Sequence, residues 1–179
     1  EKKSLAPGES SIQNSNLHLN SEQAEAVETV SKMKQGTALI WGVTGSGKTE
    51  VYLKIIEEKI RNGEGAIVLV PEISLTPQLT QRFEDRFPNM VAVFHSDQKA
   101  TETRRSWLRS FLGQARIAVG PRSALFAPIQ NLGIVIIDEE HDSSYKQEER
   151  LRYHARDAAH ALCKIKQIPL VLGSATPSV

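Results

Sequence analysis

Residues 42–49 combine three glycines with a lysine and a hydroxyl side chain, a set suited to binding phosphate. The run GVTGSGKT fits the pattern G-x-x-x-x-G-K-[ST], in which glycines let the backbone turn tightly and point its N–H groups at phosphate oxygens. Lys48 is placed to reach the β- and γ-phosphates of a nucleotide, and Thr49 to ligate Mg²⁺. We therefore predict that ATP and Mg²⁺ bind at these residues: Gly42, Thr44, Gly45, Ser46, Gly47, Lys48 and Thr49.

An acidic run follows four apolar residues, 134–137, further along the chain. In nucleotide-hydrolysing proteins with such a phosphate loop, a buried strand of this kind delivers an aspartate to the Mg²⁺ shell. Asp138 is the candidate ligand, and Glu139 is the candidate base that takes a proton from the attacking water. This adjacent pair favours hydrolysis of ATP over its use by a small-molecule kinase. On its own, the run from Asp138 to His141 would be more typical of a solvated turn.

A third set of residues, GSAT at positions 173–176, ends the last apolar run of the chain. The hydroxyls of Ser174 and Thr176 are small enough to hydrogen-bond towards Glu139 or His141 if the neighbouring strands end together. Taken alone, these four residues would be read as a Gly-Ser turn.

The elements that position these residues alternate along the chain from about residue 19. The segments of strand length are 38–43, 66–70, 91–94, 116–119, 134–137 and 169–172, and the segments of helical spacing are 20–34, 49–61, 76–86, 101–112 and 155–164. This alternation predicts an α/β fold with a parallel sheet and helices on both faces, and ligands at the carboxyl ends of its strands. Residues 1–18 are polar and predict a flexible tail or interdomain linker before a single domain at 19–179.

Composition limits the possible functions. The charges of the 22 basic and 21 acidic residues nearly cancel, so any binding to nucleic acid must depend on local groups of residues. No apolar run is long enough to span a membrane, which predicts a cytoplasmic protein without a membrane partner. The single cysteine, Cys163, is expected in the core, and it offers no set of ligands for zinc.

The three motifs in this order resemble those of superfamily 2 helicases. The resemblance implies a RecA-like first lobe, with His141 linking the ATP site to a nucleic-acid site and with Gln23 reading the adenine edge. Asn20 and Gln23 also make a capping box, and both roles could hold. Thr76, Arg122 and Ser123 lie in loops that, by the same resemblance, hold the DNA backbone. As alternatives, Thr76 caps the next helix and Arg122 forms an ion pair.

Residues 138–157 mix aromatic and basic side chains in the way that suits stacking on unpaired bases and pairing with phosphates. This stretch resembles the aromatic-rich loop of primosomal replication-restart helicases. The resemblance implies a 3′ to 5′ DNA helicase that acts on forked and single-stranded DNA, with single-stranded DNA-binding protein and primosome or helicase-loading proteins as partners. It also implies a second lobe that supplies an arginine finger. The candidate residues for DNA binding or coupling here are Tyr145, Lys146, Arg152, Tyr153 and Arg156.

Two other classes of protein fit parts of the pattern. A P-loop kinase should show an acceptor pocket and a lid, and a non-motor interaction module could keep the nucleotide fold as a relic. The solvated surface loop also stays open as an alternative for residues 138–157. ATP binding combined with DNA-stimulated turnover would separate these classes.

Overall fold

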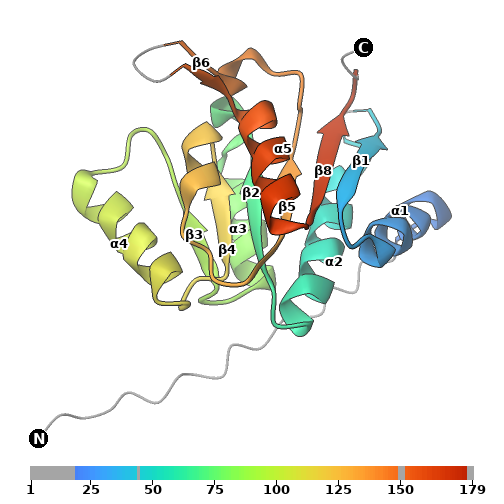
Figure 1. Ribbon diagram of the computed structural model, residues 1–179, viewed down its shortest axis with the longest axis horizontal. Coiled ribbons are helices and arrows are strands. Elements are labelled where there is room, and N and C mark those ends of the chain that lie inside the picture. The colour runs from blue at the N-terminus through green and yellow to red at the C-terminus, as the bar shows by residue number, and fades with distance from the viewer. Residues whose placement is uncertain (1–18, 44, 149–151, 177–179) are drawn as a thin grey trace, which may run out of the picture.

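The computed structural model describes residues 19–43, 45–148 and 152–176. The predicted tail at 1–18 and the predicted phosphate contact Thr44 lie outside the described residues. Six parallel strands form one sheet in the order β1-β8-β5-β2-β4-β3 (Figure 1). The strands are β1 (Gly36–Trp41), β2 (Gly65–Leu69), β3 (Val91–Val93), β4 (Ile117–Gly120), β5 (Leu132–Ile137) and β8 (Pro169–Ser174).

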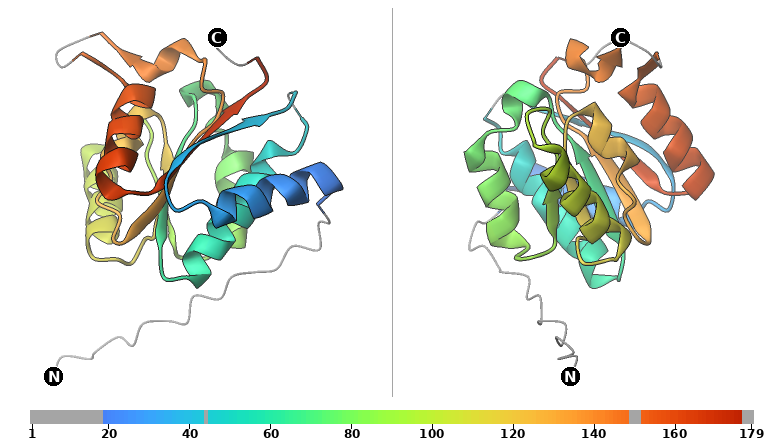
Figure 2. Two further views of the ribbon diagram at one scale, coloured as in Figure 1. Left: turned by 45° about the vertical axis from the view of Figure 1, so that its right-hand side comes forward. Right: turned by 90° about the vertical axis from the view of Figure 1, so that its left-hand side faces the viewer.

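Helices cover the two faces of this sheet (Figure 2). The helices are α1 (Ser21–Lys32), α2 (Lys48–Arg61), α3 (Pro77–Arg86), α4 (Ala100–Phe111) and α5 (Ala155–Lys166). One core joins side chains of α1, α2 and α3 to the sheet, and the other joins α5 and the short helix η2 (Arg122–Phe126) to the opposite face. Two apolar cores on one parallel sheet are the predicted α/β architecture.

The predicted strands and helices match the structure, with ends that differ by a few residues. The structure adds a hairpin of two short strands, β6 (Lys146–Gln147) and β7 (Tyr153–His154), and two further turns of 3-10 helix, η1 (Glu72–Ser74) and η3 (Ser143–Tyr145). Strands of two residues have too little periodicity to be recognised from sequence.

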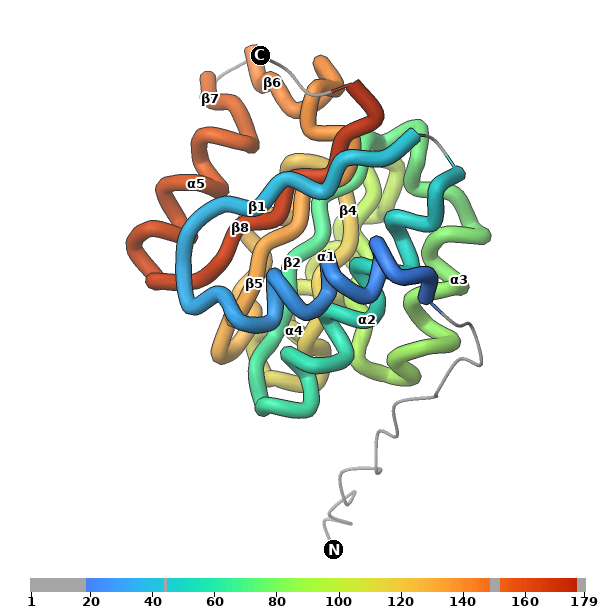
Figure 3. Tube along the Cα trace, turned by 90° about the vertical axis from the view of Figure 1, so that its right-hand side faces the viewer, coloured from blue at the N-terminus to red at the C-terminus, as the bar shows by residue number. Residues whose placement is uncertain are grey.

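Strand β1 is covered less completely than the rest of the sheet. This strand lies at the edge of the sheet, beside β8, with α1 crossing α2 next to it (Figure 3). Ala38 and Ile40 pack against the core beneath α2, whereas Leu39 and Trp41 point to the opposite face and are exposed. An edge strand has a neighbour on one side only, so its apolar side chains are covered less completely than those of the central strands β5 and β2.

Helix α4 packs with its polar face inward. Ser106 and Arg109 donate hydrogen bonds to backbone carbonyls at the β3 edge, and the buried residue of the helix is Ser110. Trp107 and Phe111 stack on each other at 5.7 Å while both stay about half exposed. Elsewhere, Cys163 is buried as expected, and burial raises the pKa of its thiol to about 12.

Among the helices in the described ranges, none is both long enough and apolar enough to cross a membrane.

Candidate nucleotide site at the carboxyl edge of the sheet

The phosphate loop connects the end of β1 to the start of α2. Gly45 and Gly47 have φ angles of 82° and 84°, in the left-handed region that favours glycine. A Cβ on Gly42 would lie 2.6 Å from the Ser46 hydroxyl, so the loop needs a glycine there as well. Among the described residues no side chain caps the first turn of α2, which leaves its N–H groups directed into the loop. A loop of this shape at a helix N-terminus is suited to bind phosphate.

Gln23 joins α1 to this loop. Its amide oxygen accepts from the Asn20 N–H at 3.0 Å and the Asn20 side chain accepts from the Gln23 N–H at 2.8 Å, which completes the predicted capping box. Its amide nitrogen donates to the Ser46 carbonyl at 2.9 Å. Both ends of the Gln23 amide are therefore bonded to protein in this structure, and its contact with adenine stays a prediction.

Asp138 follows β5 and accepts hydrogen bonds from two buried tyrosines. Tyr52 of α2 donates to Oδ1 of Asp138 at 2.9 Å, and Tyr145 donates to the Asp138 backbone carbonyl at 2.6 Å. Burial raises the pKa of the Asp138 carboxyl, although the bond from Tyr52 acts in the opposite direction. Such a carboxylate, desolvated and held at a strand end, is suited to face a cation.

Glu139 has a left-handed backbone with φ 46°, which residues other than glycine seldom adopt. Both flanking residues are held by hydrogen bonds. The Asp138 carbonyl accepts from the Tyr145 hydroxyl, and the Glu140 N–H donates to the Gly173 carbonyl at 2.9 Å. The buried Glu140 carboxylate also pairs with Arg156 at 2.9 Å. A conformation of this kind costs about 1–3 kcal/mol, so it persists because these flanking contacts hold it.

Four of the predicted site residues, Lys48, Glu139, His141 and Ser174, form a continuous chain of contacts from the start of α2 to the ends of β5 and β8. The Lys48 amine donates to the Gly42 carbonyl at 2.7 Å and lies 3.6 Å from the Glu139 carboxylate. Glu139 lies 3.9 Å from Nε2 of His141, whose Nδ1 is 3.1 Å from the Ser174 hydroxyl. The predicted contact between the 173–176 run and His141 is therefore observed. Thr176 adds an N–H bond to the same Ser174 hydroxyl at 3.2 Å.

Several residues predicted to bind DNA are engaged with the protein itself. The Thr76 hydroxyl accepts from the Leu79 N–H at 3.2 Å and caps α3, as the alternative for this residue expected. Arg122 donates to the Ser144 carbonyl at 2.6 Å, and among the described residues it does not form the ion pair that was its alternative. Ser123 is exposed beside it.

The prediction that Tyr145 stacks on a base is wrong for this structure. Its side chain is fully buried, and its hydroxyl is bonded to Asp138. Burial raises the pKa of the Tyr145 hydroxyl, so it remains a hydrogen-bond donor. Arg156 likewise differs from the expectation, because it pairs with the buried carboxylate of Glu140. Tyr145 connects the loop after β5 to Asp138, and Arg156 connects the start of α5 to Glu140 in that loop.

The β6-β7 hairpin carries the candidates that face solvent. Lys146 and Arg152 are exposed, and Tyr153 is half-buried, with its ring and that of Phe126 in a T-shaped arrangement and 5.5 Å between the ring centroids. Residues of both strands line a hollow of about 500 Å³. Phe126, which is 58% exposed, is an aromatic neighbour of Tyr153 that the sequence did not single out.

This fold and this site define a RecA-like P-loop nucleotide-binding lobe, in which the phosphate loop, an acidic strand end and a Ser-Ala-Thr strand end meet at one edge. A sequence model of the DEAD/DEAH box helicase family matches residues 20–179, and the chain belongs to this family. Replication restart protein PriA of Synechocystis sp. is 51% identical over 164 residues, which cover 90% of this chain and 20% of the relative. The Bacillus subtilis protein of the same name is 50% identical, and the match covers 91% of this chain and 21% of that protein. The chain thus spans about a fifth of the length of these curated relatives.

Solved helicase structures share the fold at lower identity. RecG bound to a three-way DNA junction has a TM-score of 0.65 at 24% identity, covering 90% of this chain and 21% of that one. The UvsW helicase from bacteriophage T4 has a TM-score of 0.63 at 16% identity, and the match covers 92% of this chain and 56% of that one. These likenesses establish the RecA-like fold.

Proposed function

We propose that this chain is the ATP-binding lobe of an ATP-dependent 3′ to 5′ DNA helicase that acts in replication-fork restart and primosome assembly. The observation that carries the proposal is the contact chain from Lys48 through Glu139 and His141 to Ser174, which links the phosphate loop to the edge where DNA would run. The similarity to proteins named Replication restart protein PriA supports the process. By resemblance, the partners are forked and single-stranded DNA, single-stranded DNA-binding protein, and primosome or helicase-loading proteins.

The proposed nucleotide is ATP with Mg²⁺. Thr49 in the first turn of α2 and Asp138 after β5 are the proposed metal ligands, since both offer the hard oxygen atoms that Mg²⁺ prefers. Asp138 is partly buried and one of its carboxylate oxygens is held by Tyr52, a position that fits such a cation. When bound, the ion would neutralise charge on the phosphates. The chain's own contribution is to hold the phosphates with Lys48 and to activate water with Glu139.

The proposed DNA surface follows the same edge. Ser123, Lys146 and Arg152 are exposed and Tyr153 is half-buried, and these side chains would pair with phosphates or stack on a base. Lys146 also pairs with the exposed Glu148 at 2.6 Å. Residues bonded within the protein, such as Arg122 and Arg156, would act by holding the loop after β5 in place. We expect the first group to set DNA affinity and the second to couple DNA to hydrolysis.

The described lobe alone should bind nucleotide weakly and hydrolyse it negligibly. The charge that develops on the γ-phosphate in the transition state needs an arginine, and the proposal places that arginine in a second lobe. Phosphate release is measured for the 179-residue chain and for the complete protein, each with and without forked DNA. DNA-stimulated hydrolysis by the complete protein alone is the expected result. Strong stimulation in the short chain would contradict the need for a second lobe, and absence of stimulation in the complete protein would contradict the proposed function.

Replacing Tyr153 by alanine in the complete protein should weaken the activation of ATP hydrolysis by DNA. One lost base stack is worth roughly 1–3 kcal/mol, so the DNA concentration for half-maximal stimulation should rise about tenfold. The affinity for ATP without DNA should not change, because Tyr153 lies on the hairpin rather than on the phosphate loop. The measurement is the ATPase rate as a function of single-stranded DNA concentration.

The buried Tyr145 gives a contrasting variant for this experiment. Tyr145→Phe removes the hydroxyl that is bonded to the Asp138 carbonyl but keeps the ring in the core. It should lower the maximal stimulated rate without changing the DNA concentration for half-maximal stimulation. If the curves of ATPase rate against DNA concentration match the wild type for both variants, the loop after β5 and the hairpin have no role in the response to DNA.

A further inference from the structure

Tyr52 makes a polar contact that the phosphate loop, the acidic run and the Ser-Ala-Thr run do not account for. It lies in the second turn of α2, four residues after Lys48 and three after Thr49. Residues at these spacings share one face of a helix. The same rigid element that presents the phosphate-binding lysine therefore also presents a tyrosine hydroxyl to the carboxylate at the end of β5, where Tyr52 donates to Oδ1 of Asp138 at 2.9 Å.

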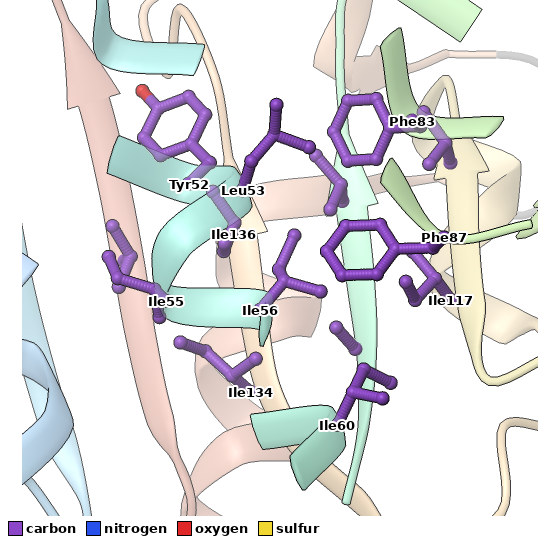
Figure 4. Packing of buried hydrophobic residues seen from close by; sticks show 14 of the residues in the cluster. Tyr52, Leu53, Ile55, Ile56, Ile60, Phe83, Phe87, Ile117, Ile134 and Ile136 are labelled. Atoms are coloured by element: carbon purple, nitrogen blue, oxygen red, sulfur yellow. The ribbon is translucent and has the colours of Figure 1, made fainter. Parts of the chain in front are cut away.

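Most of the Tyr52 side chain behaves as core. The residue is 2% exposed and belongs to the apolar cluster beneath α2. Figure 4 shows its ring at the border of this cluster, with the oxygen turned away from the other labelled side chains. Burial, followed by the charge of Asp138, raises the pKa of the Tyr52 hydroxyl, so the hydroxyl keeps its proton and donates.

Strand β8 leaves space for the Tyr52 hydroxyl. Gly173 is the fifth residue of β8, and a Cβ there would lie 1.7 Å from the Tyr52 oxygen and 3.1 Å from Oδ1 of Asp138. Any larger residue at 173 would have to displace the hydroxyl. A phenylalanine at 52 would need less room than a tyrosine, so the close approach of Gly173 serves the oxygen atom and not only the ring.

We propose that Tyr52 is a positioning residue for the metal ligand: its hydroxyl holds one oxygen of Asp138, so that the carboxylate keeps a single orientation towards the phosphate loop. This inference rests on the proposed function, in which Asp138 serves Mg²⁺. Partners that orient a metal ligand in this way typically change metal affinity or activity about 10- to 100-fold when they are removed. A fixed carboxylate loses less freedom when the cation binds, which is the physical source of the effect.

The test is Tyr52→Phe in the complete protein, which removes the hydroxyl and keeps the ring. Binding of a fluorescent, non-hydrolysable ATP analogue is measured in EDTA and across a Mg²⁺ titration, and bound Mn²⁺ is measured by electron paramagnetic resonance. Affinity in EDTA should match the wild type, because the phosphate loop is intact. The metal concentration for half-maximal binding should rise about tenfold. Metal titrations that coincide with the wild type would overturn the proposal.

Two further variants separate positioning from packing. Ile56→Val lies one turn further along α2, is fully buried, and should lower the melting temperature without moving the metal titration. A shift of the metal titration in Ile56→Val would mean that loosening α2 is sufficient, and would overturn the specific role of the hydroxyl. Gly173→Ala should reproduce the metal defect, because a Cβ at this position would displace the Tyr52 hydroxyl from Asp138.

The metal titration of the wild type distinguishes failure of the proposed role of Tyr52 from failure of the proposed function. If the wild type binds the analogue more tightly with Mg²⁺ and Tyr52→Phe behaves in the same way, the role of Tyr52 fails and the proposed function stands. If the wild type binds neither the analogue nor the metal, the proposed function fails, and the role of Tyr52 fails with it.

Discussion

Glu139→Gln in the complete protein is expected to bind ATP normally and to hydrolyse it at least about 100-fold more slowly, the usual contribution of a positioned general base. The amide keeps the shape of the side chain but cannot accept a proton from water. The carboxylate lies 3.6 Å from the Lys48 amine and 3.9 Å from Nε2 of His141, so it is placed between the phosphate-binding lysine and the Ser174 end of β8. Steady-state phosphate release with saturating DNA, together with equilibrium ATP binding, measures both quantities.

Glu84→Gln provides the matched control for this substitution. Glu84 is exposed on α3, away from the strand ends that form the nucleotide site, and the change in charge is the same. Its hydrolysis rate should equal that of the wild type. Normal turnover by Glu139→Gln, or weaker ATP binding with normal turnover, would contradict the role of Glu139 as the base.

Lys48→Ala is expected to abolish ATP hydrolysis while the lobe stays folded. Removing one charged donor from a transition state typically costs about 100- to 1,000-fold in rate, and Lys48 should also contribute to phosphate binding in the ground state. Its amine bonds to the Gly42 and Val43 carbonyls, at 2.7 Å and 3.4 Å, and these contacts belong to the loop and not to either apolar core. ATP binding and hydrolysis are measured together with thermal unfolding.

Lys164→Ala is the corresponding control, because Lys164 is exposed near the end of α5 and its loss removes the same charge. It should leave binding, hydrolysis and melting temperature unchanged. A folded Lys48→Ala protein with normal turnover would exclude residues 42–49 as the phosphate site. Unfolding of Lys48→Ala would instead show that the loop contacts of the lysine stabilise the lobe, contrary to the expectation from its position.

The sequence predicted those parts of the candidate site whose chemistry depends on a short local motif. The phosphate loop, the acidic run and the 173–176 run each follow an apolar segment, and a parallel sheet brings the ends of such segments to one edge. It misjudged Tyr145, because an aromatic ring beside basic residues suits a base stack and a packed core equally well. The contact that decided between them, from the Tyr145 hydroxyl to the Asp138 carbonyl, depends on how the loop after β5 folds back.

The sequence by itself determined the α/β class, the extent of most helices and strands, and which residues could bind phosphate, because these follow from spacing along the chain. The tertiary structure decided the strand order, which places β8 between β1 and β5 and so brings Ser174 to His141. It also decided the left-handed turn at Glu139 and the contact between Tyr52 and Asp138, residues 86 positions apart. Pairing between distant segments leaves no periodic signal in either segment, and only the folded chain brings those atoms within bonding distance.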